Sequence, residues 1–77
     1  MPKLPRISGR EFIRLLELFG LIQARQKGSH IILKKKISDG TIGTVIPHHK
    51  ELAEGTIRGL LKQAQISIDE FLALYNR

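Results

Sequence analysis

The sequence predicts an α+β fold in which one helix, a three-stranded antiparallel sheet and two further helices follow each other, with the helices on one face of the sheet. Three observations lead to this prediction. Apolar residues recur at helical spacing near both ends of the chain, β-branched residues alternate with polar ones in the middle, and glycine-containing turns divide that middle part. With 77 residues, of which 42% are hydrophobic, we expect residues 1–77 to form a single domain with a modest core.

The first helix is predicted to begin after Ser8. Ser8 and Glu11 have the spacing of a capping box, and Ile7 and Phe12 have that of a hydrophobic staple around it. One apolar stripe then follows at the i, i+3, i+4, i+7 positions Phe12, Leu15, Leu16 and Phe19. Gly20 is expected to end the helix, since glycine adopts the left-handed conformation at little cost.

The next part of the chain has the pattern of a strand meander. We expect strands over 21–26, 30–36 and 41–46, with tight turns at 27–29 and at Asp39-Gly40. Pro47 should end the third strand, because proline has no N–H to donate to the ladder. In the second strand, alternation places Ile31 and Leu33 on one face. The opposite face then carries His30, Ile32 and Lys34.

Two helices are predicted after the sheet. The first of them should begin at Gly55 or Thr56 and bury one face, formed by Ile57, Leu60, Leu61 and Ala64. The second should begin with another capping box, Ser67 with Glu70. Helices on one side leave the other face of the sheet open for a partner.

Charge is distributed unevenly along the chain. The net charge is +6, and residues 1–50 contribute +7 while residues 51–77 contribute −1. This asymmetry indicates either a face that binds a polyanion or a solvated basic surface. The absence of cysteine excludes disulfides and thiol nucleophiles. Without a leader or a membrane-spanning run near the roughly 20 apolar residues required, we expect a cytoplasmic protein that does not bind a membrane.

His30 is the main candidate for chemistry, because no phosphate-binding glycine loop, paired carboxylates or nucleophile elbow is present. Histidine titrates near neutral pH, so it can accept and donate a proton in one cycle. RNA cleavage needs such a group together with cations that offset the charge on the phosphorane. Lys27 and the run 34–36 are near in sequence. A polar residue on an exposed strand face is the competing interpretation of His30.

His48 and His49 follow Pro47 and allow several interpretations. His48 is a candidate to donate a proton or to contact a phosphate. A plain loop that leads to the next helix is the competing interpretation of both histidines. A metal site shared with His30 is disfavoured, because no carboxylate is paired with them. We therefore expect no metal and no cofactor.

Taken in order, several segments resemble the HicA-type (YcfA-like) mRNA interferases. The segments are Ile7-Ser8-Gly9-Arg10-Glu11, Arg25-Gln26-Lys27-Gly28-Ser29-His30, Val45-Ile46-Pro47-His48-His49, 55–64 and 67–71. The resemblance implies a fold like the double-stranded-RNA-binding domain, cleavage of mRNA by a toxin, and neutralisation by a HicB-type antitoxin. It also implies that His30, in the Gly-Ser-His motif, is the catalytic residue and that Lys27, Gly28 and Ser29 adjoin the site.

The sequence therefore predicts a toxin endoribonuclease that needs neither metal nor small-molecule cofactor, with mRNA and a HicB-type antitoxin as partners. The predicted catalytic residue is His30. The predicted substrate-binding residues are Lys27, Gly28, Ser29, Lys34, Lys36 and His48. The alternative is a non-catalytic double-stranded-RNA-binding module, although the segment 55–64 lacks the dense lysine cluster of such modules. An adaptor for an acidic protein is a third possibility, which predicts no affinity for RNA.

Overall fold

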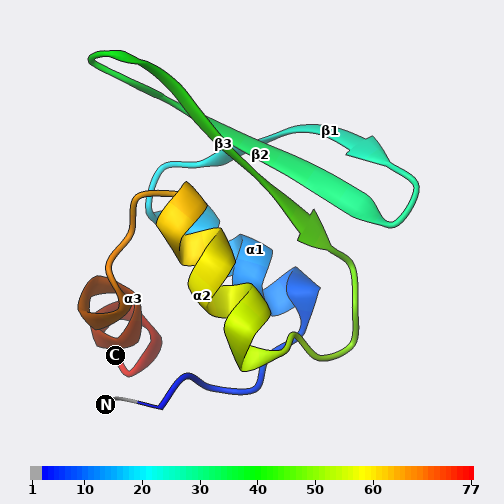
Figure 1. The fold of residues 1–77 in the computed structure, drawn as a ribbon, viewed down its shortest axis with the longest axis vertical. Coiled ribbons are helices and arrows are strands. Elements are labelled where there is room, and N and C mark those ends of the chain that lie inside the picture. The colour runs from blue at the N-terminus through cyan, green and yellow to red at the C-terminus, as the bar shows by residue number, and fades with distance from the viewer. Residues whose placement is uncertain (1–2) are drawn as a thin grey trace.

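A computed structural model of the chain describes residues 3–77. The elements along the chain are α1 (Gly9–Leu18), β1 (Ile22–Lys27), β2 (His30–Ile37), β3 (Gly40–Pro47), α2 (Glu54–Gln63) and α3 (Ile68–Tyr75). The strands form one antiparallel sheet in the order β1-β2-β3. Figure 1 shows the helices on one side of the sheet. The predicted α+β fold and its element order are confirmed.

Both predicted helix starts at serine are correct. The Ser8 side chain accepts a hydrogen bond from the Glu11 N–H, and Ser67 and Glu70 form a reciprocal capping box. The helix α2 begins at Glu54, earlier than predicted, and its cap residue Ala53 has no polar side chain to mark the start.

The ends of α1 and α2 have the same hydrogen-bond pattern. Gly20 follows α1 with φ 96°, and Leu21 N–H donates to the Leu16 carbonyl, which is the Schellman arrangement. Gln65 does the same for α2 with φ 58°, and Ile66 N–H donates to the Leu61 carbonyl. The stop at Gly20 agrees with the prediction, whereas the left-handed Gln65 has no glycine to signal it.

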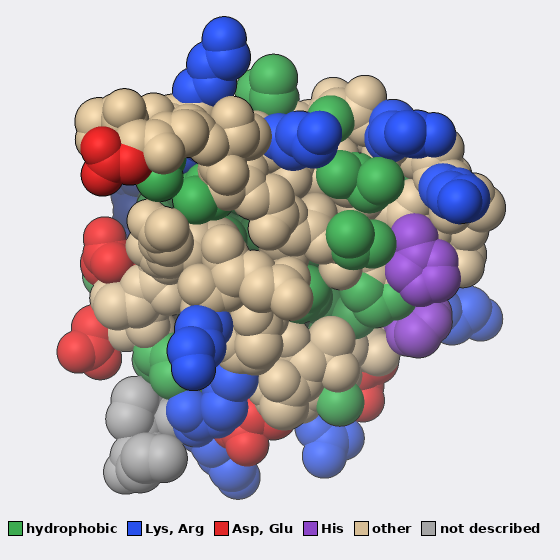
Figure 2. All heavy atoms as spheres, turned by 45° about the horizontal axis from the view of Figure 1, so that its top comes forward, with side chains coloured by type: hydrophobic (Ala, Val, Ile, Leu, Met, Phe, Trp, Pro, Cys, Tyr) green, Lys and Arg blue, Asp and Glu red, His purple; other side chains and the backbone are tan. Residues whose placement is uncertain are grey.

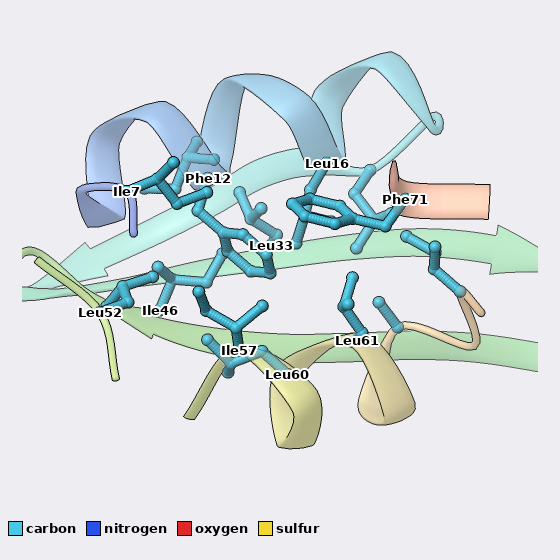
Figure 3. Packing of buried hydrophobic residues seen from close by; sticks show 14 of the residues in the cluster. Ile7, Phe12, Leu16, Leu33, Ile46, Leu52, Ile57, Leu60, Leu61 and Phe71 are labelled. Atoms are coloured by element: carbon cyan, nitrogen blue, oxygen red, sulfur yellow. The ribbon is translucent and has the colours of Figure 1, made fainter. Parts of the chain in front are cut away.

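One hydrophobic cluster joins the sheet to the helices (Figure 3). The sheet contributes Leu33 and Ile46, both fully buried. Phe12 of α1 contacts Phe71 of α3 with ring centroids 5.6 Å apart, which links the first and last helices. The cluster also contains Ile7, Ile13, Leu16, Leu21, Ile31, Leu52, Ile57, Leu60, Leu61 and Ala64. The predicted stripe of α2 is buried throughout.

The faces of β2 follow the predicted alternation. Ile31 and Leu33 point into the core, while His30 and Lys34 are exposed and Ile32 is half-buried on the opposite, open face. Because β2 is the central strand, the run 34–36 does not lie on a sheet edge. A lysine run on a strand often serves to blunt an exposed sheet edge, and the central position of β2 excludes that interpretation here.

Candidate functional site: the Lys27–His30 corner of the sheet

A two-residue hairpin places Lys27 and His30 side by side. Gly28 and Ser29 connect β1 to β2, and Gly28 has φ 60° at the first central position of the turn, as in type II′ turns. Lys27 is the direct cross-strand partner of His30, so their Cβ atoms are about 5 Å apart on the same face. The Gln26 side chain donates to the Gly28 carbonyl at 3.1 Å and supports this turn.

The role of Gly28 is therefore conformational. Nothing lies within 4 Å of the position a Cβ would take at Gly28, so the positive φ is what favours glycine there. Ser29 supplies a second support, because its carbonyl accepts from the His48 N–H at 2.7 Å. The predicted Lys27-Gly28-Ser29-His30 segment thus forms one corner of the sheet, hydrogen-bonded by Gln26 on one side and by the chain after β3 on the other.

The open face around this corner is basic. Strand alternation and pairing place Arg25, Lys27, Lys34 and Lys36 on it, and the three strands, all within the described chain, contain no Asp or Glu. Two large hydrophobic side chains are exposed there, Ile22 at 67% and Val45 at 45%. Figure 2 shows hydrophobic side chains with Lys and Arg around them and histidines at one edge. An anion approaching this face meets no opposing carboxylate from the strands.

Lys34 and Lys36 share the open face with His30 but not its immediate surroundings. They are four and six residues further along β2, which corresponds to about 13 Å and about 20 Å. Both lysines are therefore much further from His30 than Lys27 is. Lys35 points to the helix side, where its ammonium donates to the Phe19 carbonyl at 2.8 Å. Of the basic residues predicted near His30, the sheet brings only Lys27 beside it.

His48 lies at the same corner but on the other side of the sheet. Pro47 is the cross-strand partner of His30, and the ladder continues for one more hydrogen bond between His48 and Ser29. By alternation His48 faces the helix side, where it lines a hollow together with Arg10 and Arg14 of α1. The backbones of His30 and His48 are thus close in space, but their side chains lie on opposite faces of the sheet.

Gly9 allows the start of α1 to pack against the segment that follows β3. Its N–H donates to the His49 carbonyl at 2.9 Å, and a Cβ at this position would clash with the Pro47 carbonyl oxygen. The start of α1 therefore packs directly on the Pro47–His49 backbone, which in turn holds Ser29. This contact between residues 9 and 47 has no signal in local sequence.

The histidines do not form a metal centre with other side chains. Within residues 3–77, no group of three or more His, Cys, Asp or Glu side chains is arranged to hold a metal ion. No helix in this part of the chain is long and apolar enough to cross a membrane.

Residues 9–66 match the family of the HicA toxin of bacterial toxin–antitoxin systems. The matched region includes the Gly9 contact, the Lys27–His30 hairpin and the loop after β3. This chain belongs to the HicA toxin family. It is accordingly a toxin of a toxin–antitoxin system, and such a toxin has an antitoxin as its partner. Searches of curated proteins and of solved structures found no significant match.

Proposed function

We propose that this HicA-family toxin is an endoribonuclease that cleaves mRNA by acid–base catalysis at His30 without a metal, and that a HicB-type antitoxin neutralises it. The observation that carries the proposal is the pairing of an exposed histidine with Lys27 across a hairpin on a face whose strands contain no carboxylate. A phosphodiester is the substrate that this combination suits, because it is anionic and its cleavage requires proton transfer.

The reaction uses the 2′-hydroxyl of the RNA as the nucleophile. A base takes the 2′-hydroxyl proton, the 2′ oxygen forms a bond to phosphorus, and the bond from phosphorus to the 5′ oxygen breaks while that oxygen receives a proton. The products are a 2′,3′-cyclic phosphate and a 5′-hydroxyl. His30 transfers one of these protons, and the Lys27 ammonium offsets the negative charge that develops on the phosphorane.

The remaining predicted residues have supporting roles in this proposal. Gly28 and Ser29 fix the hairpin that holds His30 beside Lys27. Lys34 and Lys36 attract more distant phosphates of the same RNA strand, because they lie on the same open face. His48 contacts the substrate from the helix side of the sheet, next to the same corner.

The antitoxin part of the proposal rests on the composition of the open face. Exposed Ile22 and Val45 offer apolar contact, and the surrounding cations favour an acidic partner. A HicB-type antitoxin seated there would cover His30 and exclude RNA by occupancy.

The reaction chemistry is tested with the products and with a modified substrate. We expect the purified toxin to leave 2′,3′-cyclic phosphate and 5′-hydroxyl ends on a single-stranded RNA. A single 2′-deoxy nucleotide on the 5′ side of the mapped cleavage site should block cleavage there. Cleavage of the 2′-deoxy substrate, or products with a 5′-phosphate, would contradict the proposed reaction and would indicate attack by water.

A further inference from the structure

A hollow on the helix side of the sheet lies close to the catalytic corner. It has a volume of about 270 Å³ and lies between α1 and the first two strands. Arg10 and Arg14 line it from α1, Gln23 from β1, and His48 from the segment after β3. The polar lining and the small volume fit a charged group better than an apolar side chain.

The two arginines are arranged for an anion. They are four residues apart on α1, so they project from the same side about 6 Å apart along the helix. Both side chains are exposed, and within residues 3–77 neither lies within 4.0 Å of a carboxylate. A guanidinium binds phosphate oxygens through two parallel N–H groups, which makes arginine the cation suited to this ligand.

The rest of the lining supports the same ligand. Gln23 and His48 add N–H groups that can donate to phosphate oxygens, and the buried Ile13 and Ile31 are the apolar part of the lining. Glu17 is the one carboxylate of the lining and lies about one helical turn beyond Arg14. Because the lining holds two arginines and one glutamate, its net charge is positive.

The hollow is connected to the catalytic corner through the backbone. The hydrogen bond from His48 to Ser29 fixes the lining histidine next to the residue that precedes His30. The edge strand β1, which ends in Lys27, separates the hollow from the open face. An RNA strand with one phosphate at His30 therefore reaches the hollow by passing around this edge.

We infer that the Arg10–Arg14–His48 hollow binds a second phosphate of the RNA strand, on the opposite side of the hairpin from the phosphate that is cleaved. The inference rests on the proposed ribonuclease function and adds a substrate site to it. The site would hold the substrate in register with His30, and Arg10 and Arg14 would act in binding, not in proton transfer.

The test measures binding in a chain that cannot cleave. A fluorescein-labelled single-stranded RNA is titrated with His30→Ala and with the same chain carrying Arg10→Ala and Arg14→Ala, over a range of salt concentrations. We expect the double substitution to weaken binding at least tenfold at low salt. The slope of log K against log salt should become shallower by about 0.7 for each phosphate that the protein no longer neutralises.

Two further variants separate a site from general charge. Arg14→Lys keeps the charge but removes the paired N–H groups, so affinity should fall while the salt slope is retained. Lys62→Ala removes one charge from the exposed surface of α2, outside the hollow, and should change neither quantity measurably. Circular dichroism of each variant checks that the helices remain.

The outcomes distinguish this inference from the proposed function. If the double variant binds RNA with the same affinity and salt slope as its parent, the hollow is not an RNA site, and the ribonuclease proposal still stands. Arg10→Ala alone, measured in the same way, removes one charge from the hollow as Lys62→Ala removes one outside it. Equal reductions in affinity with these two single variants would also overturn the inference, since net charge would then explain them. If the parent does not bind RNA and the unmodified toxin does not cleave it, both proposals fail.

Discussion

Lys27 owes its position beside His30 to the hairpin between them. The cross-strand pairing and the positive φ of Gly28 keep the two side chains on one face, whereas Lys36 is about 20 Å further along β2. Two lysines on the same open face therefore have different expected roles. One can contact the phosphate that reacts, and the other can contact only more distant parts of the strand.

Lys27→Ala is expected to reduce the rate of RNA cleavage about 10²-fold, because removal of one group that stabilises transition-state charge typically has an effect of that size. Lys36→Ala removes the same charge and should reduce the rate far less. Single-turnover cleavage of one RNA by both variants makes the comparison. Equal reductions in rate would show that Lys27 acts only through the general field of the basic face.

Local sequence is sufficient to predict which residues share this face. His30 and Lys34 have the predicted orientation because strand alternation depends only on register, which the Gly28-Ser29 and Ser38-Asp39 turns fix. The second turn lies one residue earlier than the predicted Asp39-Gly40, since Gly40 is the first residue of β3 and pairs with Ile37. The position of His48 could not be predicted in the same way, since it depends on how far the β2–β3 ladder continues beyond Pro47.

At the scale of single elements, the fold lowers the pKa of a carboxyl group in α3. The pKa of the Glu70 carboxyl is lowered by hydrogen bonds with Ser67. The larger effect comes from the Ser67 backbone N–H and the smaller one from the Ser67 side chain. A lowered folded-state pKa contributes stability that is present above the unfolded-state pKa, about 4.3 for glutamate. This contribution is lost as the pH falls through the lowered value.

Glu70→Gln should therefore lower the urea midpoint of unfolding at pH 7. The difference between the two proteins should shrink as the pH falls below about 4.3, because the unmodified carboxylate then becomes protonated. Urea unfolding followed by circular dichroism at several pH values measures this. A difference that stays constant from neutral to strongly acidic pH would show that the capping carboxylate contributes no charge-dependent stability.

The contact between α1 and the segment after β3 gives a second prediction at this scale. Gly9→Ala should destabilise the fold by roughly 1–3 kcal/mol, because the added Cβ would displace the Pro47 carbonyl in a packed region. Gly59→Ala in α2 should instead stabilise it by about 0.5–1 kcal/mol, since nothing lies within 4 Å and alanine favours helix. Urea unfolding of both variants tests the opposite signs. Equal effects would mean that Gly9 is not a packing position.

The helix ends also show which element boundaries local sequence predicts and which it does not. The end of α1 and the start of α3 are predictable from Gly20 and Ser67, whose chemistry directly favours a cap. Gln65 ends α2 in a left-handed conformation that glycine would normally occupy, because the burial of Ile66 against the core determines the chain direction there. Tertiary packing overrides local preference at that position.

For the whole molecule, the two faces of the sheet have different surroundings. One face carries the core and the helices, and the other is basic, partly apolar and uncovered. The uneven charge along the sequence predicted such a surface. It could not predict the Arg10–Arg14–His48 hollow, which forms where residues from α1, β1 and the segment after β3 meet.

A complex with a HicB-type antitoxin should not cleave RNA, because the antitoxin would occupy the open face. In hydrogen–deuterium exchange, the complex should protect 22–32, which includes the corner at Lys27 and His30, while α3 should be unchanged. A complex that cleaves as fast as the free toxin, or that protects only the helices, would contradict neutralisation by occupancy.

The central claim is that His30 carries out metal-independent RNA cleavage. It is tested most directly by incubating a defined single-stranded RNA with the purified toxin and with His30→Ala, both in excess EDTA, and separating the products on a gel. We predict cleavage by the unmodified toxin and a rate about 10²–10⁴-fold lower for His30→Ala with the fold intact. Equal cleavage by both proteins, or cleavage that EDTA abolishes, would contradict the claim.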